Sequence, residues 1–168
     1  MKNKLASFWL IGVILLLAQI FLFRDFAIWD RAFLFLYIYL ILKSPLNFGI
    51  FWTLTLAFIV GWVVDLFLLS YGLHAFSAVL LAFIKYPLLR IIGFDNNNEE
   101  DLSINLSTLK IQRIVPYFFI ATFIYSFSYF ILEASDRSIF GIVLLKSIFT
   151  SIITSIIFIL VEFFSTSK

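Results

Sequence analysis

Six apolar runs, separated by short charged or turn-forming breaks, account for most of the chain. They cover residues 5–23, 26–42, 48–69, 75–92, 114–132 and 139–164. A helix rises about 1.5 Å per residue, so about 20 residues cross a hydrocarbon core of about 30 Å. Charged residues make up only 13% of the sequence, about half the share that is usual in soluble domains. The pattern predicts an all-α membrane protein, a bundle of six transmembrane helices in a single integral membrane domain over residues 1–168.

The second run departs most from this pattern. Its uncharged part, residues 32–42, is too short to span a bilayer, so a second spanning helix has to include Asp30 and Arg31 at the membrane interface. The alternative is a half-inserted hairpin. That alternative leaves five spans and places the C-terminus on the other side of the membrane.

The first run follows a basic start, Met1-Lys-Asn-Lys4, as a secretory signal does. The run is longer than the usual signal core of about 7 to 15 residues, and Arg24-Asp25 stands where a small-residue cleavage site is expected. We therefore predict an uncleaved first helix. The chain has no cysteine, which excludes disulfides, thiolate metal sites and cysteine nucleophiles.

Lysine and arginine are distributed unevenly between the two ends of the predicted helices. With a cytoplasmic N-terminus, the inner ends and loops hold Lys2, Lys4, Lys43, Arg90, Lys110, Arg113 and Lys168. The outer loops hold Arg24, Arg31 and Arg137. Because positive charge favours the cytoplasmic side, both termini are predicted to be cytoplasmic. The polar, acidic stretch at 93–113 then becomes a cytoplasmic loop, which we interpret as a solvated linker.

Asp65 is the charged residue of the third run. A charged side chain at the bilayer centre costs roughly 2.5 to 3.5 kcal/mol on insertion scales, so it needs a partner or a use. Residues at intervals of four precede it on one slowly drifting helix face: Gly49, Thr53, Ala57 and Gly61. Small residues in such a stripe let a second helix approach closely. We predict a helix-packing stripe that carries Asp65 into the protein.

The sixth run offers a possible ion-pair partner, Lys146. Lys146, Thr150 and Thr154 form one line at four-residue spacing, and Ser147, Ser151 and Ser155 form its neighbour. Counted from the outer helix ends, Asp65 lies about 6 Å and Lys146 about 10 Å into the bilayer, so we predict that they pair. In the alternative, Lys146 extends outward along its own helix and the backbone of the turn at 70–74 satisfies Asp65. Lys85 and Glu162 are expected to extend to the inner headgroups.

His74 is the only histidine, in a turn after Gly72. Glycine supplies the backbone angles that a tight turn between helices often requires. Nowhere does the chain carry a serine nucleophile elbow, a metal-binding histidine pair or a glycine-rich phosphate loop. We therefore expect no catalysis, no cofactor, no metal and no nucleic-acid partner, and we interpret His74 as a polar residue that caps a helix or contacts the wet interface.

The stretch at residues 58–77 carries Gly61, then Asp65 four residues later, then a turn with Gly72 and His74. It resembles the signature of the MreD family, small membrane proteins of bacterial rod-shape determination, in which a Gly-Leu-His or similar turn opens the next helix. Chain length, helix count and topology are also similar to that family. Outside this stretch the likeness rests on hydropathy alone.

The resemblance implies a non-catalytic subunit of the machinery that elongates the cell and synthesises lateral peptidoglycan, in the cell inner (cytoplasmic) membrane. Implied partners are an MreC-like single-span protein, RodA, a class B penicillin-binding transpeptidase and an MreB-like filament on the cytoplasmic side. The implied fold is similar to the substrate-binding subunits of energy-coupling-factor transporters.

That kinship supplies an alternative function, a solute-binding subunit of a vitamin-type membrane transporter. The polar candidates of the short outer loops are Tyr71, His74, Glu133 and Asp136, few for a solute pocket. A third hypothesis is a proton- or ion-coupled carrier that uses Asp65. It is the least supported, because the ionisable groups stand at different depths.

Overall fold

The computed structural model describes residues 2–21, 33–45, 49–92, 111–134 and 140–166. These residues form helices and contain no strand. The helices are α1 (Lys2–Phe21), α2 (Ile38–Leu42), α3 (Gly49–Leu68), α4 (Leu73–Ile91), α5 (Ile111–Glu133) and α6 (Phe140–Thr166). The predicted loop at 93–113 falls outside the described residues except at 111–113, which already belong to α5.

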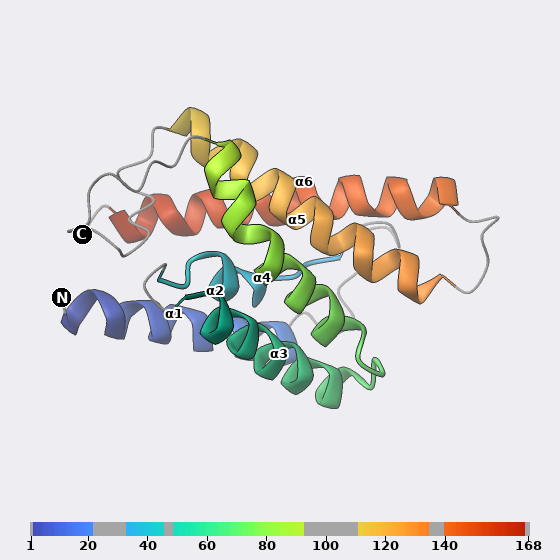
Figure 1. Cartoon of the computed structure of the whole chain (residues 1–168), viewed down its shortest axis with the longest axis horizontal. Helices are drawn as coiled ribbons and strands as arrows, with labels where there is room; N and C mark the ends of the chain where they lie inside the picture. The colour runs from blue at the N-terminus through green and yellow to red at the C-terminus, as the bar shows by residue number, and fades with distance from the viewer. Residues whose placement is uncertain (1, 22–32, 46–48, 93–110, 135–139, 167–168) are drawn as a thin grey trace.

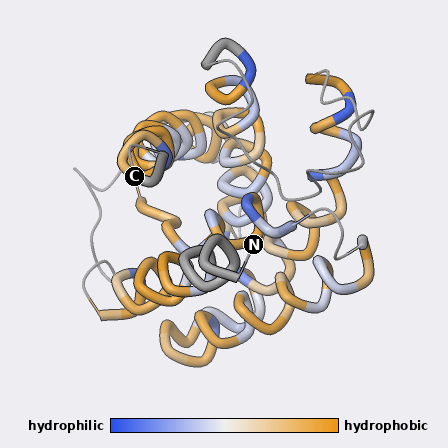
Figure 2. Tube along the Cα trace, turned by 90° about the vertical axis from the view of Figure 1, so that its left-hand side faces the viewer, coloured by the Kyte–Doolittle hydropathy of each residue, from blue (hydrophilic) through white to orange (hydrophobic). Residues whose placement is uncertain are grey.

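Four stretches are long and apolar enough to cross a membrane: Gly49–Leu68, Leu73–Ile91, Arg113–Glu133 and Phe140–Phe164. A shorter apolar stretch, Trp9–Phe21, belongs to α1. Large apolar side chains such as Trp62 and Phe83 are more than half exposed on these helices, and Figure 2 shows orange, hydrophobic stretches on the helices with paler and blue turns between them. The prediction of a helical, multi-pass membrane protein is confirmed at this level, whereas six spans are not established.

The long helices pack against their neighbours in chain order. α3 packs on α4, α4 on α5 and α5 on α6, while α1 contacts α2 and α3. In Figure 1, α1, α3 and α5 run in one direction and α4 and α6 return, so that α1 begins and α6 finishes at the same end of the bundle. Which side of a membrane that end faces stays a prediction.

The second apolar run does not form the helix that we expected over 26–42. Among its described residues, 33–37 are not helical and α2 has only five residues. Residues 34–42 are each at most 5% exposed, and α2 lies in the middle of the bundle (Figure 1). We call residues 33–44 the central segment. The expected spanning helix is therefore wrong for this part of the chain, and residues 22–32, which would decide the hairpin alternative, lie outside the described ranges.

Side chains from other helices replace the missing helical hydrogen bonds of the central segment. Thr150 Oγ1 accepts from the Phe33 N–H at 3.0 Å, and Gln19 Oε1 accepts from the Leu36 N–H at 2.9 Å. At the other end, the Tyr117 hydroxyl donates to the Leu42 carbonyl at 3.1 Å. Irregular backbone at membrane depth is tolerated where it is buried in protein and its polar groups are satisfied. These bonds satisfy three of the polar groups of that backbone.

Candidate functional site

The turn between α3 and α4 has an unusual backbone. Gly72 has φ +92° and stands directly before α4, and Leu69 and Tyr71 also have positive φ. Only glycine enters this left-handed region without a steric cost from a Cβ atom. The expectation that Gly72 supplies special backbone angles is therefore met, and the turn brings the start of α4 back against the end of α3.

Gly72→Ala is expected to lower the free energy of unfolding by about 1 to 2 kcal/mol, the usual cost of a left-handed residue with a Cβ. A Cβ at this position would meet no atom within 4 Å, so the loss would come from the backbone alone. Gly72→Asn should lose less, because asparagine tolerates this region better. Unfolding of the purified protein in mixed detergent micelles measures both variants. Equal losses in the two would contradict the backbone explanation.

Asp65 caps α4 from the neighbouring helix. Its Oδ1 accepts from Ser70 Oγ at 2.6 Å and from the His74 N–H at 3.0 Å, and its Oδ2 accepts from the Ala75 N–H at 2.8 Å. The first N–H groups of a helix have no partner within the helix, and a negative charge is favourable there. The buried carboxylate therefore satisfies α4 and ties its start to α3.

Lys146 does not pair with Asp65. Its Nζ lies over the rings of Phe33 and Phe130, at 5.6 and 5.9 Å from their centroids. An ion pair within 4.0 Å joins Lys43 and Glu162 instead. The alternative partner for Asp65, the turn that follows it, is the one the structure contains. It lies close in sequence and offers two backbone donors at a helix start.

The predicted stripe on α3 lies partly on its buried face. Thr53, Ala57, Gly61 and Asp65 are buried. Gly61 marks the closest approach, because a Cβ there would stand 2.6 Å from Ala75 Cα. Gly49 does not share this face. It opens α3 with φ +70°, is exposed, and has open space where a Cβ would be.

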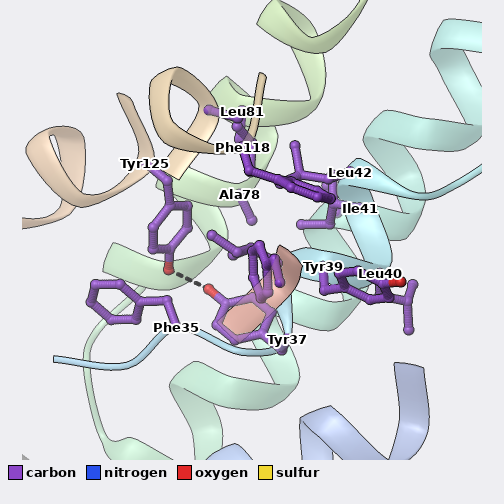
Figure 3. Close-up of a cluster of buried hydrophobic side chains, with 14 of the residues drawn as sticks. Phe35, Tyr37, Tyr39, Leu40, Ile41, Leu42, Ala78, Leu81, Phe118 and Tyr125 are labelled. Atoms are coloured by element: carbon purple, nitrogen blue, oxygen red, sulfur yellow. Dashed lines mark hydrogen bonds between the residues drawn. The ribbon is translucent and has the colours of Figure 1, made fainter. Parts of the chain in front are cut away.

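The His74 side chain is buried in the bundle, 1% exposed, and bonds to two tyrosine hydroxyls instead of capping a helix or contacting the wet interface as we expected. Its Nδ1 lies 2.8 Å from the Tyr125 hydroxyl and 3.2 Å from the Tyr37 hydroxyl. The two hydroxyls also bond each other (Figure 3), and the Tyr129 ring lies 4.6 Å from the imidazole. Tyr37, His74 and Tyr125, which we call the tyrosine–histidine cluster, connect the central segment with α4 and α5.

Lys85 and Glu162 do not extend to the headgroups as we expected. Lys85 is fully buried on α4, and its Nζ donates to oxygens of Ile41 and Ser44. Glu162 is buried on α6, where its Oε2 accepts from Lys43 Nζ at 2.6 Å and from the Tyr39 hydroxyl at 2.8 Å. Both charges hold the central segment, and sequence reasoning missed this because their partners lie far away in the chain.

Replacing Lys43 by methionine or Glu162 by glutamine is expected to weaken the contact between the central segment and α6. The pair is largely but not fully shielded, with side chains 18% and 8% exposed, so we expect a coupling free energy of about 1 to 2 kcal/mol. Unfolding of the two single variants and the double variant measures it as a double-mutant cycle. Strictly additive losses would show that the pair contributes nothing.

The polar face of α6 is buried against the rest of the bundle. Ser147, Thr150, Ser151, Thr154 and Ser155 are at most 4% exposed. Across the α5–α6 contact, the Thr122 and Ser155 hydroxyls are 2.9 Å apart. Interhelical hydroxyl bonds of this kind hold helices together in lipid.

The polar groups of the α3–α4 turn act on the protein itself. Both carboxylate oxygens of Asp65 accept hydrogen bonds from the turn and from α4, and the His74 Nδ1 faces two tyrosine hydroxyls in the core. Within the described ranges, no three His, Asp or Glu residues gather in a way that would hold a metal ion. The arrangement is that of a structural anchor. No family model, no curated protein and no solved structure matches this chain.

Proposed function

We propose that the chain is a non-catalytic membrane subunit of the bacterial cell-elongation machinery. In this role it assembles in the cell inner membrane with an MreC-like single-span protein and helps control cell shape and lateral peptidoglycan synthesis. The sequence support is the resemblance to the MreD family at Gly61, Asp65, Gly72 and His74. The observation that carries the proposal is the bonding of Asp65 to the turn and to the start of α4.

That bonding favours an assembly role over chemistry or ion transfer. A carboxylate that accepts three hydrogen bonds from its own bundle, two of them from backbone N–H groups, is suited to fix a helical hairpin. Exposed apolar side chains such as Phe58, Trp62 and Leu66 lie beside the packing face of the same helix. These side chains are available to lipid or to the membrane helix of a partner. The α3–α4 hairpin would hold α3 in the position where a partner helix binds.

Affinity purification from the source bacterium in mild detergent tests the proposal. Tagged wild-type protein is expected to retain a single-span protein with a periplasmic domain, together with RodA and the class B transpeptidase at lower yield. An MreB-like filament is the expected cytoplasmic partner. A bound vitamin or a tightly associated ATPase module would instead identify the chain as a transporter subunit and would contradict the proposal.

Asp65→Ala and Glu133→Gln form a matched pair for the same experiment, because Glu133 is exposed at the end of α5. Asp65→Ala is expected to reduce recovery of the single-span protein at least fivefold per molecule of chain in the membrane, whereas Glu133→Gln should keep it. Normalising to the amount of chain separates lost assembly from lost accumulation. Full recovery of the single-span protein with Asp65→Ala would show that assembly does not depend on the hydrogen bonds of Asp65.

A further inference from the structure

The Lys85 ammonium is enclosed by three oxygens of the central segment. Nζ lies 2.6 Å from the Ser44 carbonyl, 2.6 Å from Ser44 Oγ and 3.1 Å from the Ile41 carbonyl. We call these three atoms the oxygen cage. The lysine and the serine are both 0% exposed, so the oxygen cage lies away from the molecular surface.

The cage arises because α2 is short. Ile41 is one of the last residues of α2, and Ser44 lies just after the helix. Because the helix does not continue, no N–H group four residues further on in a helix bonds to either carbonyl. Carbonyls at the C-terminal end of a helix carry partial negative charge and attract cations. Ser44 Oγ also donates to the Ile41 carbonyl at 2.8 Å, which fixes two members of the cage relative to each other.

Among the residues that the structure describes, no carboxylate lies within 4.0 Å of the Lys85 ammonium. A buried charge normally has an opposite charge or a set of dipoles to compensate it. Here two carbonyls and one hydroxyl compensate it, and the Tyr86 ring lies 5.8 Å from Nζ.

The geometry matches a cation site. An ammonium has three N–H donors and no acceptor, and the cage presents three oxygens to it. Carbonyls at helix breaks hold free monovalent cations in some membrane transporters. In this chain a tethered ammonium from α4 takes that place.

We propose that the oxygen cage is a binding site for a monovalent cation of the ammonium class, which Lys85 fills, and that this cation holds the central segment in the bundle. Without it, the Ser44 carbonyl would lose its donor, and the Ile41 carbonyl would keep only the bonds that Ser44 donates. The α2 end would then loosen, while the tyrosine–histidine cluster would still hold the segment near Tyr37. This inference does not depend on the proposed function.

The absence of cysteine from the sequence makes a thiol reporter straightforward. Leu42→Cys places a thiol at a fully buried position beside the cage, and its rate of reaction with N-ethylmaleimide reports opening of the central segment. The full chain is labelled in detergent at constant pH and ionic strength, in N-methylglucamine chloride or in ammonium chloride. N-methylglucamine is too large to enter the cage.

With Lys85 present, slow labelling in both salts is expected. In the reporter background, Lys85→Ala should raise the labelling rate at least tenfold in N-methylglucamine chloride, and ammonium chloride should lower it again at least threefold. The control is Lys146→Ala, which removes a half-buried ammonium that faces aromatic rings and no oxygen cage. It should label at the same rate in both salts.

Two results would overturn the proposal: wild-type labelling rates in Lys85→Ala, or raised rates that ammonium does not lower. If Lys85→Ala does not accumulate as folded protein, Lys85→Met is tested in its place. Methionine keeps most of the apolar stem and removes the charge. Labelling at least tenfold faster than wild type in Lys85→Met supports the role of the ammonium. An unchanged rate rejects it.

Discussion

Asp65→Ala is expected to lower the free energy of unfolding by about 3 to 5 kcal/mol. The substitution removes the acceptor from three donors at once: Ser70 Oγ and the backbone N–H groups of His74 and Ala75. A buried donor without a partner costs about 1 to 3 kcal/mol, and bonds to a charged acceptor are at the upper end. Asp65→Asn keeps one acceptor oxygen and should lose an intermediate amount.

Unfolding of the purified chain in mixed detergent micelles measures these losses, and two variants bracket them. Ser70→Ala breaks one of the three bonds and should cost about 1 kcal/mol. Lys146→Met would cost as much as Asp65→Asn if the two charges paired, but it should cost little beyond its ring contacts and its attraction to Glu133 in the observed arrangement. A loss in Asp65→Ala no larger than in Ser70→Ala would show that the backbone bonds do not stabilise the hairpin.

Hydropathy was sufficient to place the four long stretches. The runs predicted over 48–69 and 114–132 match α3 and α5 to within a few residues, because apolar length is the main condition for a helix in a membrane. The turn after the third run was also predicted correctly. A glycine between two helices favours a positive φ, and Gly72 has one. These features depend on local sequence alone.

The central segment was not predictable in the same way. Residues 34–42 are apolar because they are buried on every side, and a short apolar run cannot be assigned to helix or irregular chain by periodicity alone. The groups that stabilise its irregular backbone include Gln19 and Thr150, which come from α1 and α6. A single sequence contains no sign of such long-range partners.

The candidate site shows the same division between local and distant contacts. The partners of Asp65 lie within ten residues of it, in the turn and at the start of α4, and the sequence offered them as one of two alternatives. His74 and Lys85 have partners on the central segment and, for His74, on α5. Their burial depended on where that segment lies, and its position could not be derived.

Gly61→Ala is expected to destabilise the protein by about 3 kcal/mol. A Cβ at Gly61 would stand 2.6 Å from Ala75 Cα and 2.9 Å from both Ala75 N and the His74 carbonyl oxygen. These are backbone atoms, which cannot rotate away as a side chain can, so α3 and the start of α4 have to separate. Overpacking of a close contact typically costs about 1 to 3 kcal/mol, and here it also stretches the Asp65 bonds.

Gly141→Ala is the matched control, because a Cβ at Gly141 on α6 would meet no atom within 4 Å. Its stability should equal or slightly exceed that of the wild type, since alanine favours a helix over glycine. The double variant Gly61→Ala with Asp65→Ala should lose less stability than the sum of the two single losses. Both changes disrupt the same contact between α3 and α4. Full additivity would mean that Asp65 holds α4 without help from the close approach at Gly61, and that these two motif residues act separately.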